Sequence, residues 1–305
     1  TTRGSERRTS ARVVWTTQAG GRGRYDTAVH YREMSLNTAV TRDPASLLPE
    51  VLRIVEAAGT AILEVYASGH DVEYKADDSP ITRADRAAHD ILSAGLRQLT
   101  PDIPVLSEES AAEHAPDVRH RWSDFWLIDP LDGTKEFINR NGEFTVNVAL
   151  VRDHKPVLGV VAAPVLNLVY YGVAGAGAFV AHEGGAAQPI KVRHPAADPL
   201  VIVGSRSHRG DSLDSVLERI GAHEMRPMGS SLKFCLVAEG TADFYPRLGP
   251  TCEWDTAAAQ AVVEAAGGSV TTLDGLPLRY NERDTLLNPH FLAYGDASRH
   301  WHKLF

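Results

Sequence analysis

Apolar side chains recur at helical spacing in two stretches before residue 100. Residues 46–67 place them three and four positions apart, and Ser46 supplies an N-cap for a first helix. A second helix is predicted over residues 82–99, where Thr82 is the N-cap residue and Asp85 follows at position N3. Both segments are typical of amphipathic helices that cover a core.

The pattern then changes from helices to strands. β-Branched and aromatic residues alternate with other residues, and Gly or His-Lys-Pro sequences interrupt the runs. The predicted strands are residues 71–74, 105–106, 125–129, 144–152, 156–163, 168–173 and 177–181. Short breaks separate the last five, which indicates an antiparallel meander.

After residue 200, strand and helix patterns alternate. The strand-like segments are residues 201–203 and 242–245, and the helical segments are residues 212–220, 230–239 and 254–266. Gly267 and Gly268 provide a C-cap for the last helix. We therefore predict an α+β fold in which residues 44–197 form an antiparallel-sheet half and residues 198–305 an α/β half.

Size and composition are those of an ordinary soluble enzyme. The chain has 305 residues, 43% of them apolar, and no apolar stretch approaches the length that spans a bilayer. A formal charge of −8 argues against a nucleic-acid partner, which normally meets a basic face. The two cysteines, Cys235 and Cys252, give no disulfide framework or zinc site and fit a reducing compartment.

Residues 1–33 differ in composition from the rest of the chain. They hold seven Arg and three acidic residues, and they show no apolar periodicity. We expect this extension to be disordered. We also expect Met34 to be the true translation start, in which case deleting residues 1–33 leaves activity unchanged.

Two aspartates follow the apolar run that ends at residue 128. Asp129 and Asp132 lie three positions apart around Pro130, and a turn there would aim both carboxylates to one side. A hard cation such as Mg²⁺ requires such oxygen ligands. The alternative is an ordinary tight turn with two solvated aspartates.

Two further acids strengthen the metal-site interpretation. Glu108 follows a predicted strand, and Asp255 begins the Ala-rich helix. One ion could take Glu108, Asp129 and the Leu131 carbonyl, while a second takes Asp129, Asp132 and Asp255. Without a cation, four converging carboxylates would repel one another and raise their pKa values.

Gly133 and Thr134 follow these aspartates at a predicted helix start. Free backbone N–H groups there form a seat for a phosphate. The Thr134 hydroxyl could orient or deprotonate a water if Asp85 accepts its proton. The alternative role of Thr134 is helix capping.

Together these motifs resemble a known family over residues 46–295. The chain is similar to the lithium-sensitive, Mg²⁺-dependent phosphomonoesterases related to inositol monophosphatase, and among them most similar to the CysQ-type 3'(2'),5'-bisphosphate nucleotidases. The resemblance is carried by residues 75–82, 106–109, 129–137, 141–147, 229–240 and 245–247.

The resemblance implies a layered α/β/α/β/α sugar-phosphatase fold and a centre of two or three Mg²⁺ ions. It implies that the metal ligands are Glu108, Asp129, the Leu131 carbonyl, Asp132 and Asp255. Glu108 and Thr134, backed by Asp85, would position the attacking water.

The implied substrate is adenosine 3',5'-bisphosphate, cleaved at the 3' position to AMP and phosphate, with the 3'-phosphosulfate analogue as a second candidate. This reaction would serve sulfate assimilation. The residues implied to bind the substrate are Asp132, Gly133, Thr134, His208, Ser230, Lys233, Arg247 and Asp255. Of these, His208 and Lys233 could instead be ordinary surface charges.

Two rival functions remain open. The same metal site could act on inositol monophosphate or fructose 1,6-bisphosphate, or the protein could bind metal and nucleotide without turnover. The resemblance implies a cytoplasmic protein without an integral membrane segment. Peripheral association with the cytoplasmic face of the inner membrane is the alternative location.

Overall fold

Two long helices pair along one side of the protein. In the computed structural model, which describes residues 42–68, 72–74, 80–182, 185–205 and 211–305, they are α1 (Pro44–Ser68) and α2 (Arg83–Leu99). The α2 N-terminus has the predicted capping box, because the Thr82 hydroxyl accepts from Ala84 N and the Asp85 carboxylate accepts from Thr82 N. Both predicted helices are confirmed.

A seven-stranded sheet packs against this helix pair. Its strands, in spatial order, are β3 (Val105–Ser107), β4 (Asp124–Asp132), β5 (Thr145–Arg152), β6 (Lys155–Ala163), β7 (Leu168–Val173), β8 (Gly177–His182) and β9 (Gln188–Ile190). Strands β4 to β9 pair antiparallel in chain order, and β3 joins β4 in parallel. The predicted meander is confirmed. A separate hairpin pairs β1 (Val72–Tyr74) with β2 (Pro80–Thr82).

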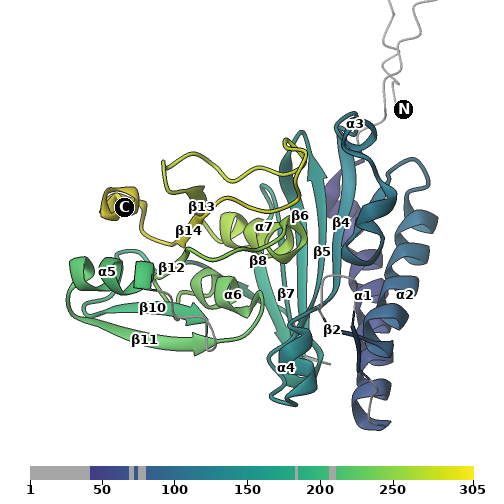
Figure 1. The fold of residues 1–305 in the computed structure, drawn as a ribbon, viewed down its shortest axis with the longest axis horizontal. Helices are drawn as coiled ribbons and strands as arrows, with labels where there is room; N and C mark the ends of the chain where they lie inside the picture. Colours follow the sequence, from purple (N-terminus) through teal and green to yellow (C-terminus); the bar gives the residue numbers. More distant parts are fainter. Residues whose placement is uncertain (1–41, 69–71, 75–79, 183–184, 206–210) are drawn as a thin grey trace, which may run out of the picture. The chain divides into compact units, whose positions relative to one another are not determined.

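Both faces of the seven-stranded sheet are buried, because side chains alternate between two cores along each strand. On β4, Trp126 and Ile128 belong to the core shared with α1 and α2. Phe125 and Leu127 point to the other face, into the core shared with α6 (Leu232–Ala238) and α7 (Ala257–Ala265). Figure 1 shows the helix pairs on opposite sides of the sheet.

A five-stranded sheet lies beyond α6 and α7. Its strands, in spatial order, are β11 (His223–Met228), β10 (Leu200–Ser205), β12 (Phe244–Arg247), β14 (Phe291–Tyr294) and β13 (Ser269–Thr272). Its outer side packs against α5 (Asp211–Ile220) and η5 (Trp301–Leu304), where Trp301 stacks on Phe244 with ring centroids 4.3 Å apart. The order of layers is therefore α/β/α/β/α, as the resemblance implied.

Short helical segments connect these layers. They are η1 (Glu108–Glu113), α3 (Pro116–Arg119), α4 (Thr134–Ile138), η2 (Pro164–Leu166), η3 (Glu253–Asp255) and η4 (Ala297–Arg299). Within the described residues, no helix is both long enough and apolar enough to cross a membrane. Residues 42–305 form one compact unit, so the division near residue 198 stays a prediction. Residues 1–33 lie outside the described residues.

Helix α7 lies unusually close to the seven-stranded sheet. A Cβ atom at Gly159 on β6 would meet the Ala258 carbonyl oxygen at 2.1 Å, and one at Gly172 on β7 would meet Val262 Cα at 2.8 Å. Only glycine leaves room for this approach. The approach fixes the depth at which α7, and the η3 segment that precedes it, meet the sheet.

Candidate metal centre

A bulge at the end of β4 aims two aspartates the same way. Asp129 pairs with Asn147 and Asp132 with Thr145, so three steps along β4 match two steps along β5. Residues three apart in a regular strand face opposite sides, and the extra residue corrects this. The predicted turn at Pro130 is therefore wrong. The segment is a bulged strand, where a missing N–H is tolerated.

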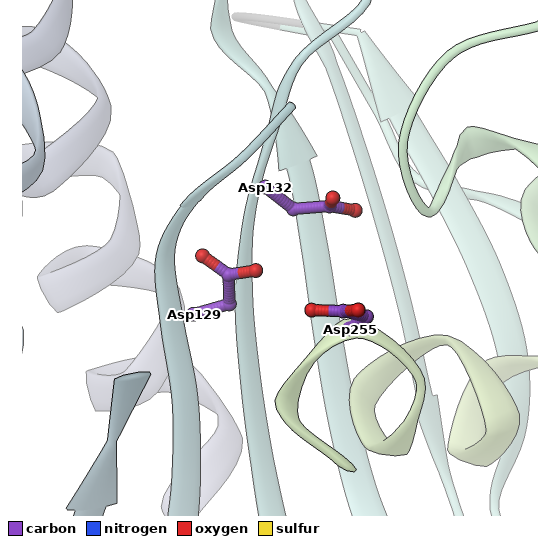
Figure 2. Close-up of side chains that lie close together, drawn as sticks. All are labelled: Asp129, Asp132 and Asp255. Atoms are coloured by element: carbon purple, nitrogen blue, oxygen red, sulfur yellow. The ribbon is translucent and has the colours of Figure 1, made fainter. Parts of the chain in front are cut away.

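A third carboxylate reaches the same place from a distant part of the chain. Asp255 ends η3, and one residue, Thr256, separates it from α7. Carboxylate oxygens of Asp129, Asp132 and Asp255 all lie within 4.8 Å of one another. Figure 2 shows the two strand aspartates and Asp255, from the helical segment, gathered around one space.

Backbone N–H groups orient all three carboxylates. Each carboxylate accepts on one oxygen: Asp129 from Leu131 (3.0 Å), Asp132 from Ser231 (2.7 Å) and Asp255 from Cys252 (2.8 Å). Within the described part of the chain, the second oxygen of each aspartate receives no hydrogen bond. Each aspartate therefore has one oxygen fixed by the protein and one that remains available to a cation.

Burial and mutual repulsion make this cluster electrostatically costly without a cation. Asp129 is 1% exposed, and burial, followed by the charges of Glu108 and Asp132, raises its pKa well above the usual range. Burial also raises the pKa of Asp255, with Asp132 as the next cause. A set of carboxylate oxygens in this condition suits a hard divalent cation.

Glu108 lies beside this cluster but outside its closest group. It is the first residue of η1, directly after β3, and Ser107 caps η1 by accepting a hydrogen bond from Glu109 N (3.3 Å). Because β3 pairs with β4 in parallel, Glu108 leaves the sheet near Asp129. Its charge contributes to the raised pKa values of both Asp129 and Asp255.

Asp85 and Thr134 occupy helix starts. Asp85 is buried, which raises its pKa, and its Oδ2 accepts from both the backbone N–H (2.7 Å) and the hydroxyl (2.6 Å) of Thr82. Thr134 is the first residue of α4, after Gly133 at a φ of 93°. Among the described residues no hydrogen bond joins Asp85 to Thr134, so the expected proton relay stays a prediction.

The expected substrate contacts lie on the α6 side of the cluster. Lys233 is buried, its Nζ donates to the Ser230 carbonyl (2.5 Å), and burial lowers its pKa to about 8 against the opposing charge of Asp132. Arg247 donates to the Pro250 carbonyl (3.0 Å), and its buried Nε has no hydrogen-bond partner within the described ranges. His208 lies outside the described residues.

Sequence reasoning missed the polar residues that support Asp132. Ser231 donates to Asp132 Oδ2 from its backbone N–H (2.7 Å), and its hydroxyl lies 2.9 Å from the same oxygen. Thr145 and Asn147 on β5 approach that oxygen at 3.5 Å. A signal was available, because these two residues put polar side chains on one face of an otherwise apolar strand.

Comparison with known proteins identifies the family. Residues 43–303 match the description "Inositol monophosphatase family". The chain belongs to this family. Enzymes of the family use divalent metal ions, and the cluster of Asp129, Asp132 and Asp255 is an acidic group suited to one.

Three relatives with high sequence identity to this chain carry the same name, CysQ. The chain is 53% identical to a Salmonella typhimurium protein named "3'(2'),5'-bisphosphate nucleotidase CysQ" over 247 residues, which cover 80% of this chain and 98% of that protein. It is 52% identical to the protein of that name in Escherichia coli K12, with the same coverage. The crystal structure of CysQ from Bacteroides thetaiotaomicron superposes with a TM-score of 0.71 at 40% identity, covering 82% of this chain and 97% of that one.

Proposed function

We propose that this protein is a Mg²⁺-dependent phosphomonoesterase that cleaves adenosine 3',5'-bisphosphate at the 3' position to give AMP and phosphate. The observation that carries the proposal is the convergence of Asp129, Asp132 and Asp255 within 4.8 Å. The choice of nucleotide is supported by relatives named 3'(2'),5'-bisphosphate nucleotidase at 52% and 53% identity. The 3'-phosphosulfate analogue is a second candidate substrate, and sulfate assimilation is the proposed setting.

The donor set suits Mg²⁺, which binds oxygen ligands and usually takes one or two carboxylates per ion. We assign Asp129, Asp132 and Asp255 as ligands, together with Glu108 and the Leu131 carbonyl, for two or three ions. Bound there, Mg²⁺ supplies positive charge to the phosphoryl oxygens and lowers the pKa of a water. The fixed oxygen of each aspartate keeps the other one directed at the cluster.

The chain's own groups take the remaining roles. Glu108 and Thr134 orient the attacking water, with Asp85 behind Thr134 as the proposed proton acceptor. Gly133 and Thr134 offer backbone N–H groups at the start of α4 to the phosphate that is cleaved. These groups hold the phosphate so that the attacking water lies opposite the oxygen that leaves.

The second phosphate of the nucleotide requires cations apart from the metal. Lys233 and Arg247 supply them, and a pKa of about 8 leaves Lys233 mostly charged at neutral pH. Ser230 adds a buried hydroxyl that has no hydrogen-bond partner in the described part of the chain and is available to a ligand. His208 completes the proposed nucleotide contacts.

The decisive test is phosphate release from adenosine 3',5'-bisphosphate, 3'-AMP, inositol 1-phosphate and fructose 1,6-bisphosphate, each with Mg²⁺ and with EDTA. We expect Mg²⁺-dependent release with a strong preference for the bisphosphate nucleotide. Lys233→Met should raise KM for the bisphosphate more than for 3'-AMP, because only the bisphosphate carries the second anion. Asp129→Asn should abolish turnover without unfolding the protein.

The other outcomes would change the proposal in defined ways. Preference for inositol or fructose phosphates would keep the metal chemistry and overturn the nucleotide assignment. Mg²⁺ binding without turnover of any of the four would favour a non-catalytic binding protein. Inhibition by lithium and recovery from the cytoplasmic or the membrane fraction of cells would test the remaining predictions.

A further inference from the structure

Ser231 contacts the segments that carry two of the three clustered aspartates. Its backbone N–H donates to Asp132 Oδ2 at 2.7 Å, and its Oγ lies 2.9 Å from the same oxygen. The same Oγ lies 2.7 Å from the backbone carbonyl oxygen of Asp255. Ser231 itself is 2% exposed, so water does not compete for these contacts.

Asn147 determines how the Ser231 hydroxyl is used. The Asn147 side-chain amide donates to Ser231 Oγ at 2.9 Å, which leaves the single hydroxyl proton for Asp132 or for the Asp255 carbonyl. Whichever acceptor takes that proton, Ser231 Oγ packs against both segments. Asn147 is 1% exposed and lies on β5, opposite Asp129 in the sheet.

These contacts connect three segments that come from distant parts of the chain. Asp132 ends β4, Asp255 ends η3, and Ser231 immediately precedes α6. A rotation of the Asp132 carboxylate would break its bonds to Ser231, and a shift of η3 would break the contact with Ser231 Oγ. Ser231 therefore fixes both the orientation of Asp132 and its separation from Asp255.

We propose that Ser231, held by Asn147, is a positioning residue that sets the affinity of the acidic cluster for a divalent cation. This inference rests on the proposed metal site, although not on the nucleotide as substrate. Removing a hydrogen-bonding partner of a metal ligand typically lowers metal affinity by about 10- to 100-fold. We expect a loss of that size for Ser231→Ala.

The experiment measures Mn²⁺ binding to the metal-free full chain by electron paramagnetic resonance, with circular dichroism to verify folding. Ser231→Ala is the main variant, and Ser231→Thr, which keeps the hydroxyl, should restore most of the affinity. Asn147→Val removes the amide and should give a smaller loss than Ser231→Ala, since the hydroxyl remains. It also serves as the second test if Ser231→Ala does not fold.

Ser93→Ala is the matched control. Ser93 is a buried serine of α2, its hydroxyl has no hydrogen-bond partner among the residues that the structure describes, and none of the three clustered aspartates lies on α2. It should bind Mn²⁺ like the wild type. If Ser231 had only a structural role, Ser231→Ala would lower the urea midpoint in EDTA and leave the Mn²⁺ dissociation constant of the folded protein unchanged.

The outcomes separate this inference from the proposed function. Folded Ser231→Ala and Asn147→Val proteins that bind Mn²⁺ within threefold of the wild type would overturn the inference, even if the wild type hydrolyses the nucleotide. Weakened binding in a protein that hydrolyses no nucleotide would support the inference and reject the proposed function. A wild type that binds no Mn²⁺ would reject both.

Discussion

The close approach of α7 to the sheet predicts a large effect from one methyl group. In Gly159→Ala, the new Cβ would lie 2.1 Å from the Ala258 carbonyl oxygen and 2.8 Å from Ala261 Cβ. The first distance is about 1.3 Å short of the 3.4 Å at which ordinary contact begins. Because both partners belong to the body of α7, no side-chain rotation relieves the clash.

The protein must therefore separate α7 from β6. Overpacking of this kind costs roughly 1–3 kcal/mol of stability. Since only Thr256 separates Asp255 from α7, a separation of about 1 Å also moves the Asp255 carboxylate relative to Asp129. Misplacement on that scale lowers the rate by about 100-fold. We expect Gly159→Ala to fold, to lose roughly 1–3 kcal/mol and to lose about 100-fold in kcat.

The assay is Mg²⁺-dependent phosphate release, with a urea titration to measure stability. Gly175→Ala is the matched control: Gly175 has a φ of 78°, so alanine there costs roughly 1–2 kcal/mol, but its Cβ would contact nothing within 4 Å. That variant should be destabilised and keep the wild-type kcat. The reasoning fails if folded Gly159→Ala has wild-type kcat and Mg²⁺ dependence, or if both variants lose the same activity.

Three further predictions concern the metal and two buried charges. Mg²⁺ at 100 times its dissociation constant should raise the melting temperature by roughly 5–10 °C, from about 2.7 kcal/mol of binding energy. Asp255→Asn should abolish that rise and melt higher than the wild type in EDTA, and a retained rise would exclude Asp255 as a ligand. Arg119 is 1% exposed and donates to Asn281 at 2.6 Å. Arg119→Met should cost about 1–3 kcal/mol in urea titrations, because it leaves the buried Asn281 side-chain oxygen without its donor, and a loss below 1 kcal/mol would contradict this. Asp296 has its pKa lowered to about 2 from the usual 3.8, chiefly because the Ser298 hydroxyl donates to it. Its charged form therefore stabilises the fold above pH 4. The loss in free energy of unfolding that urea titrations give for Asp296→Asn at pH 6 should be smaller at pH 3. An equal loss at both pH values would refute this prediction.

Local patterns predicted much of the architecture, because both faces of the central sheet and both long helices follow regular periods. The strands β4 to β8 and the capping box at Thr82 are examples. Strand β11 was missed because it is an edge strand with few buried side chains. Strands β13 and β14 were also missed.

The sequence singled out the three aspartates that the structure brings together, but it did not give their arrangement. The spacing of Asp129 and Asp132 around Pro130 fits either a turn or a bulge, and only pairing with β5 decides between them. Ser231 carries no local signal of its own, because its partners come from β4, β5 and η3. Such contacts depend on tertiary packing, which no window of sequence contains.

The sequence separation between Asp129 and Asp255 has a consequence for folding. A chain that has formed the seven-stranded sheet before α7 docks holds only two of the three clustered carboxylates. A cation therefore gains its full binding energy only when the last layers assemble. Interactions absent from the transition state slow unfolding and leave the folding rate nearly unchanged. The bound ion would thus lower the unfolding rate and lengthen the lifetime of the folded protein, while leaving the folding rate nearly unchanged.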